Sequence, residues 1–296
     1  MTARDGECPG CRSARSRPAF RSGDRAYRRC RDCRTLWIAD PPEAGEIDEV
    51  YADERYFANP EFSSGGYHGY KDYLADREEI EEKFDRVLER AERITAPGRL
   101  LDVGAGPGVL LVTAGSRGWQ GVGVDLNPWA VETAAELGAD VRAGTISDGG
   151  FDDDEFDLVA MMDVVEHVDE PEAMVAEAAR VVRPGGAVAV LTPDAGSIIT
   201  RLMGSRWPEA QRTDHLVLFS VRGLGELLRR HGLEPVDWHW IGKRSSIATL
   251  IADVSPAAPR AGHFLQSLVG RRPVARRRVE INPLSKFCLY ARSAAR

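Results

Sequence analysis

Between about residues 99 and 240, short apolar runs alternate with longer stretches in which apolar residues recur every three or four positions. This alternation is typical of strands joined by helices, and it predicts a parallel sheet built from βαβ units. Helices are expected at 128–138, 171–182 and 221–231, and the "RPGG" after the second predicts a turn. The predicted strands are "RLLDVG", "QGVGVDL", "ADVRAG", "FDLVAMMD" and "AVAVLTP", followed by "EPVDWHWIG" and "LSKFCLYARS" nearer the C-terminus.

The chain divides into three zones of different composition. Residues 1–39 are rich in Arg and Cys and poor in apolar residues, which predicts a small module. Residues 40–95 run through a Tyr-rich stretch into an acidic helix expected at about 72–94, and residues 96–296 form the α/β domain. Within that domain we expect a loop at "GSRWPEAQRTDHLVLFS" and a polar insertion at about 252–280.

Length and charge narrow the class of protein. The 296 residues suffice for one large α/β domain with a small appendage. The net charge of −7 argues against a protein built mainly to bind nucleic acid, although the first 34 residues carry ten Arg against four acidic residues. There is no apolar run long enough for a membrane helix, and the N-terminus lacks the apolar core of a signal peptide. We therefore expect a cytoplasmic protein without a membrane partner; the oligomeric state stays open.

The stretch "LLDVGAGPG" predicts a strand, a glycine-rich turn and the start of a helix. Gly104, Gly106 and Gly108 would let the backbone approach a ligand, and the N–H groups at the helix N-terminus would face it. Asp102 precedes the turn, where it would favour an amino group and repel a pyrophosphate. Asp125 ends the next strand, where it can accept hydrogen bonds from both hydroxyls of a ribose.

These features favour S-adenosylmethionine over a dinucleotide. A dinucleotide fingerprint would have its third glycine at position 109, which is Val109 here. No basic phosphate cradle accompanies the turn. One acid for an ammonium group and one for a ribose match a cofactor that carries both. A purely structural turn is the alternative.

On these motifs the chain resembles the class I S-adenosylmethionine-dependent methyltransferases, in the group that includes ubiquinone-biosynthesis-type enzymes. The resemblance covers about residues 96–235 and extends to "VGVDLNP" and "FDLVAMMDVVEHVDEPEAMVAEAARVVRPGGAVAVLTPD". It implies a Rossmann-like sheet of seven strands, six parallel and the last reversed. By position, it also implies contacts to the methionine moiety from Gly104, Gly106 and Gly108, to the ribose from Asp125 beside Leu126, to the adenine from Thr145 and Ile146, and to the sulfonium side from Met162 and Asp163.

Four of the five cysteines lie within the first 33 residues, as "CPGC" and "CRDC" separated by eighteen residues. Each pair predicts a knuckle, and four thiolates can hold a structural zinc ion with no open position. Two disulfides are the alternative, which the knuckle spacing and the expected compartment disfavour. So small a segment has no core of its own, so the metal would supply its folding energy. The predicted ligands are Cys8, Cys11, Cys30 and Cys33.

The module and the aromatic residues after it also carry a resemblance. "CPGC", "YRRCRDCRTLWIADPP" and the following Tyr residues are similar to the N-terminal zinc module of some bacterial methyltransferases from sugar and natural-product pathways. The resemblance implies that the module and the Tyr-rich segment cover the substrate side of the cofactor.

Methyl transfer from a sulfonium is an in-line displacement, and an alcohol or carbon acid must also lose a proton. His215 is the first candidate for the base because it follows the fifth strand, at the sheet edge where ligands bind. Asp214 is its neighbour in the chain, and His167 in "DVVEHV" is the second candidate. Tyr67 and Tyr70 are expected in a lid. Structural or packing roles are the alternative for all five.

Three functions remain open at this point. The first is a methyltransferase acting on oxygen or carbon of a small molecule, such as a sugar, nucleotide-sugar or secondary metabolite. The second is an RNA base methyltransferase gripping RNA with its basic module, against which stand the acidic total charge and "MMDVVEH" in place of an "NPPY"-type motif. The third is a non-catalytic scaffold that retains the fold.

Overall fold

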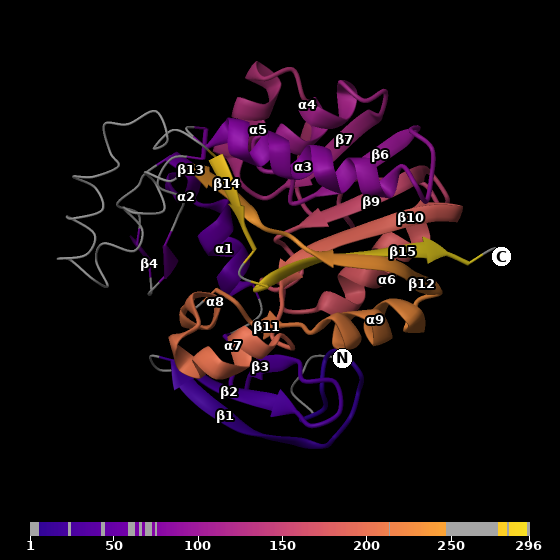
Figure 1. Ribbon diagram of the computed structural model, residues 1–296. Coiled ribbons are helices and arrows are strands. Elements are labelled where there is room, and N and C mark those ends of the chain that lie inside the picture. Colours follow the sequence, from indigo (N-terminus) through magenta and orange to yellow (C-terminus); the bar gives the residue numbers. More distant parts are fainter. Residues whose placement is uncertain are drawn as a thin grey trace.

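The computed structural model describes residues 6–22, 25–42, 45–58, 63–64, 67–68, 73–74, 76–212, 214–246, 278–282 and 284–294. A seven-stranded sheet forms its centre (Figure 1). The last strand runs antiparallel to both of its neighbours, and the other six are parallel, so the predicted class I methyltransferase sheet is confirmed. In spatial order the strands are β12 (Leu233–Trp240), β15 (Lys286–Ser293), β10 (Val182–Pro193), β9 (Phe156–Met162), β6 (Arg99–Val103), β7 (Gln120–Asp125) and β8 (Val141–Ala143).

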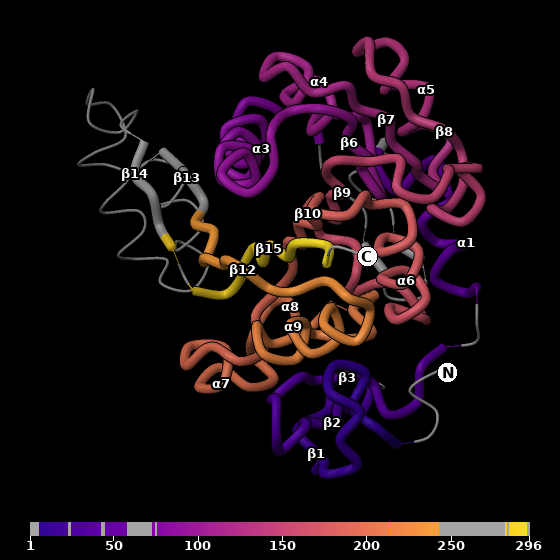
Figure 2. Tube along the Cα trace, turned by 90° about the vertical axis from the view of Figure 1, so that its right-hand side faces the viewer, coloured from indigo at the N-terminus to yellow at the C-terminus, as the bar shows by residue number. Residues whose placement is uncertain are grey.

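Helices cover both faces of this sheet (Figures 1 and 2). The alternation of side chains along a strand divides the core into two apolar layers. Val188 and Val190 of β10 pack into one layer, and Ala187, Ala189 and Leu191 pack into the other. One face carries α3 (Arg77–Ala91), α4 (Val109–Gly115) and α5 (Pro128–Glu136), and the other carries α6 (Pro171–Val181) and α9 (Val221–Arg230).

The prediction of a turn at "RPGG" was only partly right. Strand β10 already begins at Val182, and the four residues form an irregularity inside it. Pairing with β9 shifts between Val182 and Ala187, and Gly185 has a φ of 76°, which L-residues with side chains rarely adopt. The glycine therefore bends the strand instead of separating it from the helix.

A second, antiparallel sheet contains the N-terminal module. Its strands are β1 (Ser16–Ser22), β2 (Arg25–Cys30), β3 (Leu36–Ile38) and β11 (Val217–Leu218). The predicted loop at "GSRWPEAQRTDHLVLFS" was wrong, because this segment supplies β11 and two short helical turns. These are η2 (Gly204–Arg206) and α8 (Pro208–Gln211), which follow α7 (Ile198–Met203). Elements of two to six residues are too short to show a period in the sequence.

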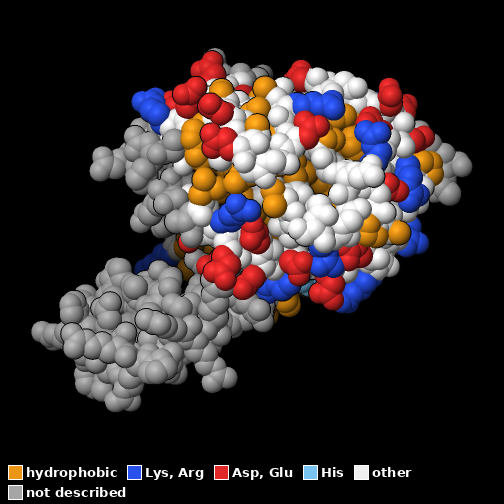
Figure 3. Space-filling model, turned by 90° about the horizontal axis from the view of Figure 1, so that it is seen from above, with side chains coloured by type: hydrophobic (Ala, Val, Ile, Leu, Met, Phe, Trp, Pro, Cys, Tyr) orange, Lys and Arg blue, Asp and Glu red, His pale blue; other side chains and the backbone are white. Residues whose placement is uncertain are grey.

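The remaining described elements are α1 (Glu46–Ala52), α2 (Arg55–Ala58) and two antiparallel sheets of two strands each. These pair β4 (Ser63–Ser64) with β5 (Tyr67–His68), and β13 (Lys243–Ser246) with β14 (Arg278–Ile281). Most of the predicted insertion at 252–280 lies outside the described residues. None of the described helices has the length and apolar character needed to cross a bilayer. Acidic and basic side chains are interspersed over the face seen in Figure 3.

Candidate active site

The glycine turn lies at the carboxyl end of β6. Gly106 has a φ of 51°, and its N–H donates to Oδ2 of Asp125 at 2.7 Å, which joins the turn to the end of β7. Gly108 begins α4 with a φ of 75°, and a Cβ there would lie 2.6 Å from Cβ of Ala139. The turn thus needs glycine both for its backbone conformation and for close packing of helix against sheet.

A cavity of about 200 Å³ opens beside this turn. Its walls come from the carboxyl ends of β6, β7 and β9, from α1 and α2, and from the segment around α8. Gly108, Asp102 and Asp214 do not line it. Of the residues predicted to bind the cofactor or to act in catalysis, those that line it are Gly104, Gly106, Asp125, Leu126, Thr145, Ile146, Met162, Asp163, His167 and His215.

Two acids at the cofactor side have raised pKa values. Asp102 is buried, and its Oδ1 has no hydrogen-bond partner among the described residues. Burial, and then the neighbouring Asp125, raise the pKa of Asp102 well above its usual range. Burial also raises the pKa of Asp125, although the N–H groups of Asn127 and Gly106 oppose the shift. Asp125 lines the cavity, so the hydroxyls of a bound ligand would relieve the cost of its burial, and this acceptor fits the ribose of S-adenosylmethionine.

Thr145, predicted to contact the adenine, is hydrogen-bonded within its own loop. Asp148, three residues further along the chain, accepts from the N–H of Thr145 at 2.9 Å and from its hydroxyl at 2.6 Å. These bonds lower the pKa of Asp148, and the bond from the Thr145 hydroxyl has the larger effect. Its carboxylate therefore fixes the loop after β8, while Ile146 offers an apolar wall to the cavity.

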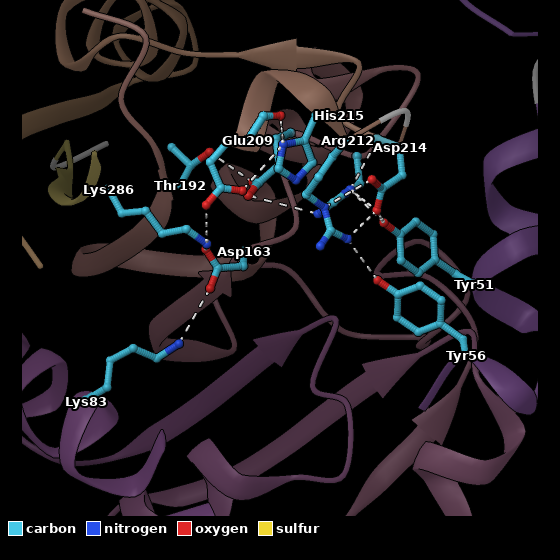
Figure 4. A network of polar contacts seen from close by, with 12 residues as sticks. Tyr51, Tyr56, Lys83, Asp163, Thr192, Glu209, Arg212, Asp214, His215 and Lys286 are labelled. Atoms are coloured by element: carbon cyan, nitrogen blue, oxygen red, sulfur yellow. Dashed lines mark hydrogen bonds and ion pairs between the residues drawn. The ribbon is translucent and has the colours of Figure 1, made fainter. Parts of the chain in front are cut away.

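Asp163 directly follows β9 and lies between two lysines that sequence reasoning did not identify. Its carboxylate lies 3.0 Å from Nζ of Lys286 on β15 and 3.5 Å from Nζ of Lys83 on α3 (Figure 4). Burial alone would raise the pKa of Asp163, but Lys286 and Lys83 outweigh it and hold that pKa well below the usual range. The carboxylate is thus ionised and already neutralised by the protein.

His215 lines the cavity and is buried, near Glu209 and Asp214 (Figure 4). Its Nδ1 lies 2.7 Å from the backbone carbonyl oxygen of Glu209. A carbonyl only accepts, so Nδ1 carries the proton and Nε2 keeps its lone pair. Burial, and then the nearby His167, lower the pKa of His215 well below 6.5. The imidazole is therefore a neutral base at physiological pH.

Asp214 contacts His167, not His215. Nδ1 of His167 lies 3.0 Å from the carbonyl oxygen of Asp214 and 3.5 Å from its Oδ2. The Tyr51 hydroxyl donates to the same Oδ2 at 2.7 Å, and Arg212 donates to it at 2.6 Å. Burial opposes ionisation of Asp214, but His167 and Arg212 hold its pKa well below the usual range. This network fixes His167, whose ring centroid lies 4.6 Å from that of His215.

Glu166 completes the polar wall. Its Oε2 accepts a hydrogen bond from the Thr192 hydroxyl at 2.9 Å. Its Oε1 has no hydrogen-bond partner among the described residues and lies 4.0 Å from Nε2 of His167. Burial, and then Asp163, raise the pKa of Glu166 to about 8. It is therefore largely protonated near neutral pH.

Aromatic side chains between Tyr51 and Tyr73 line one side of the cavity. A Cβ on Gly106 would lie 3.8 Å from Cζ of Phe57, so this ring covers the glycine turn. Phe57 stacks on Trp129 at 5.8 Å between ring centroids, and Tyr73 meets its edge. Of the predicted lid pair, Tyr67 lies in β5 without a described side chain, and Tyr70 lies outside the described residues.

Sequence reasoning missed several residues of the site, including Tyr51, Phe57, Glu209, Arg212 and Lys286. They belong to five different elements or loops and share no motif. The one available signal was the dense run of aromatic and charged residues at "EVYADERYF".

The four N-terminal cysteines meet as predicted. Sγ of Cys8 lies 3.4 Å from that of Cys33, Sγ of Cys11 lies 3.6 Å from that of Cys30, and all four sulfurs lie within 4.8 Å of one another. All four are free thiols. Tetrahedral zinc with Zn–S bonds of about 2.3 Å places sulfurs about 3.8 Å apart, so the cluster fits the ion.

A family model described as a methyltransferase domain matches residues 73–237, more than half of the chain. The chain belongs to this methyltransferase family. Its fold and its relatives make it an S-adenosylmethionine-dependent methyltransferase.

Curated relatives include the ubiquinone biosynthesis O-methyltransferase of Cereibacter sphaeroides, 29% identical over 67% of this chain and 84% of that protein. The enzyme of that name from Mesorhizobium japonicum is 32% identical over 51% of this chain and 63% of its own. Among solved structures, the YcgJ protein of Bacillus subtilis has a TM-score of 0.52 at 18% identity and covers 73% of this chain and 99% of its own. A methyltransferase from Archaeoglobus fulgidus has a TM-score of 0.51 at 16% identity, covering 75% and 100%. These structures support the fold.

Proposed function

We propose that this methyltransferase transfers a methyl group to an oxygen or carbon atom of a small molecule, such as a sugar, a nucleotide-sugar or a secondary metabolite, with oxygen favoured. The observation that carries the proposal is that one cavity joins the glycine turn to the neutral, buried His215. The relatives named O-methyltransferases support the choice of oxygen.

Bound S-adenosylmethionine supplies an electrophilic methyl group. The glycine turn would hold its methionine moiety, Asp125 beside Leu126 its ribose, and Thr145 with Ile146 its adenine. Met162 and Asp163 would face the sulfonium side. Phe57 covers the turn and would exclude water from the reacting atoms.

His215 is the proposed base. Its Nδ1–H is held by Glu209, so Nε2 can take the proton of an acceptor hydroxyl as the oxygen attacks. His167, positioned by Asp214 and Tyr51, would orient the same hydroxyl. Aligning acceptor and methyl group is the other main contribution of the protein, because displacement at a sulfonium depends on an in-line approach.

Zinc in the four-cysteine cluster has a structural role in this proposal. Four ligands leave no open position for a substrate. Cys8, Cys11, Cys30 and Cys33 would hold the ion as thiolates, which would stabilise this small module.

A radiolabelled methyl-transfer screen tests the function. Purified protein is incubated with S-adenosylmethionine labelled in the methyl group and with pools of phenols, sugars, nucleotide-sugars and RNA. Label entering a low-molecular-weight product, lost in His215→Ala, is the expected result. Label in RNA would support the nucleic-acid alternative, and cofactor binding without turnover on any pool would support the scaffold.

A further inference from the structure

One segment of the acceptor site lies between the four-cysteine module and the core. Residues 214–220 carry Asp214 and His215. On the core side, the N–H groups of Leu216 and Val217 donate to the carbonyl of Glu166 at 2.8 and 3.1 Å. On the module side, Val217 of β11 pairs with Trp37 of β3. The segment thus has a hydrogen-bonded partner on each side.

Tyr27 of β2 makes a direct link from the module to the proposed base. Its buried hydroxyl donates to the backbone carbonyl of His215 at 3.1 Å and lies 3.5 Å from that of Arg212. Ile38 of β3 donates its N–H to the carbonyl of Leu216 at 3.0 Å. Backbone positions on both sides of Asp214 are therefore held by module residues.

The second cysteine knuckle contacts the residues that follow the segment. The Ser220 hydroxyl donates to the carbonyl of Cys33. A Cβ on Gly223 would lie 2.0 Å from Oγ1 of Thr35 and 3.2 Å from Sγ of Cys33, so α9 begins against the knuckle itself. Arg230 of α9 donates to the carbonyl of Pro9 in the first knuckle at 3.3 Å.

The cofactor turn is built from other elements. The turn is formed at the ends of β6 and β7 and at the start of α4, which covers the same face of the sheet as α3 and α5. The module lies against α9 and β11 on the opposite side of the sheet (Figures 1 and 2). A disturbance of the module would reach the segment 214–220 before it reached the glycine turn.

We propose that the four-cysteine module is the positioning device of the acceptor site: through Tyr27 and the β3–β11 pairing it holds the backbone of His215 and Asp214. Release of a zinc ion held by the four cysteines would then impair methyl transfer and leave cofactor binding intact. Tyr27 is a positioning residue, because it touches the backbone of the base and not the reacting atoms. The role in catalysis rests on the proposed function; the structural coupling does not.

The substitution Tyr27→Phe tests the link with a matched control. Tyr290→Phe also removes one buried Tyr hydroxyl that donates to a backbone carbonyl, that of Val87 at 3.2 Å, on the opposite side of the sheet. We expect Tyr27→Phe to lower kcat at least tenfold and to shift the pH profile of the base, with the dissociation constant of S-adenosylhomocysteine unchanged within twofold. Tyr290→Phe should leave kcat and the pH profile unchanged. Equal effects of the two variants on kcat would overturn the proposal.

Hydrogen exchange on the full chain, before and after zinc release by a mercurial reagent, tests the coupling without an acceptor. We expect amides of 214–220 to lose protection at least tenfold while those of 99–125 keep it and S-adenosylhomocysteine still binds. Unchanged protection of 214–220 would overturn the proposal, as would unfolding of the whole chain or loss of cofactor binding. If no acceptor is ever methylated, the proposed function fails and the exchange result alone decides this inference.

Discussion

The two halves of the cavity are built in different ways. The proposed cofactor half comes from one stretch of the chain, from Val103 to Met162, in which the residues that line the cavity lie at or just after the carboxyl ends of β6, β7, β8 and β9. The acceptor half brings together α1, α2, the loop after β9, the segment 214–220 and Lys286 of β15. One half is thus a motif, and the other is a tertiary assembly.

The acidic residues of the two halves also differ in their electrostatic surroundings. On the cofactor side, burial raises the pKa values of Asp102 and Asp125, and the described residues supply no cation to either carboxylate. Where the two halves meet, Lys286 and Lys83 hold the pKa of Asp163 well below its usual range despite its burial. On the acceptor side, His167 and Arg212 do the same for Asp214. Asp125 on the proposed cofactor side thus has no cationic partner among the described residues, whereas the acceptor half balances its own charges and leaves His215 neutral.

The largest expected effect separates the halves by function. His215→Ala should lower kcat by about 10²- to 10⁴-fold, the usual contribution of a general base. Binding of S-adenosylhomocysteine should stay within twofold, because His215 lies on the acceptor side. Steady-state kinetics and calorimetry on the same preparation measure both. A variant that transfers methyl groups at the wild-type rate would remove His215 from the mechanism.

The next effect concerns stability. The pKa of Glu166 is raised from 4.5 to about 8, so the folded state keeps a proton that the unfolded state releases within this window. The contribution of Glu166 to the free energy of unfolding therefore falls as pH rises from 4.5 to 8, by about 1 kcal/mol per pH unit. Urea denaturation of Glu166→Gln at pH 5, 6, 7 and 8 should lack this slope. Parallel curves for variant and wild type would contradict the assignment.

A smaller effect is expected at the ribose position. Asp125→Ala should weaken S-adenosylhomocysteine binding by about 10- to 100-fold, since hydrogen bonds to a charged acceptor contribute about 1.5–3 kcal/mol. Asp140→Ala is the matched control: this exposed carboxylate lies just before β8 and outside the cavity. Equal losses in the two variants would point to general destabilisation.

The smallest expected effect is the pH dependence of kcat/KM that His215 imposes. The pKa of His215 is lowered by burial and by His167, Arg212 and Lys286, against an opposing effect of Asp214. A base acts when deprotonated, so kcat/KM should hold constant as pH falls to 6.5 and decline only below it. A midpoint at or above 6.5 in the pH–rate profile would show that His215 is more solvated than the structure indicates.

Much of the cofactor half could be predicted because its determinants are local. The spacing of Gly104 to Gly108 and the acid that ends β7 are visible in short stretches, as is the pairing of cysteines into knuckles. The number of strands in the sheet and the reversed direction of the last one followed from the resemblance to a known family, and the structure confirmed both.

The acceptor half could not be predicted to the same depth, since its contacts join distant residues. Trp37 and Val217 pair although most of the chain lies between or after them, and the two residues of β11 are too few to form a recognisable strand pattern. Adjacency in sequence was also a poor guide: Asp214 contacts His167, which lies 47 residues away, while its neighbour His215 bonds Glu209. Such pairs are set by packing, which no local pattern encodes.

The central claim is that one cavity has a cofactor half and an acceptor half that can be separated by mutation. The most direct measurement is calorimetric titration of S-adenosylhomocysteine into wild type, Asp125→Ala and His215→Ala, each checked for folding and zinc content. We expect binding by wild type and His215→Ala, with at least tenfold loss in Asp125→Ala. Folded wild-type protein that does not bind, or equal losses in the two variants, would contradict it.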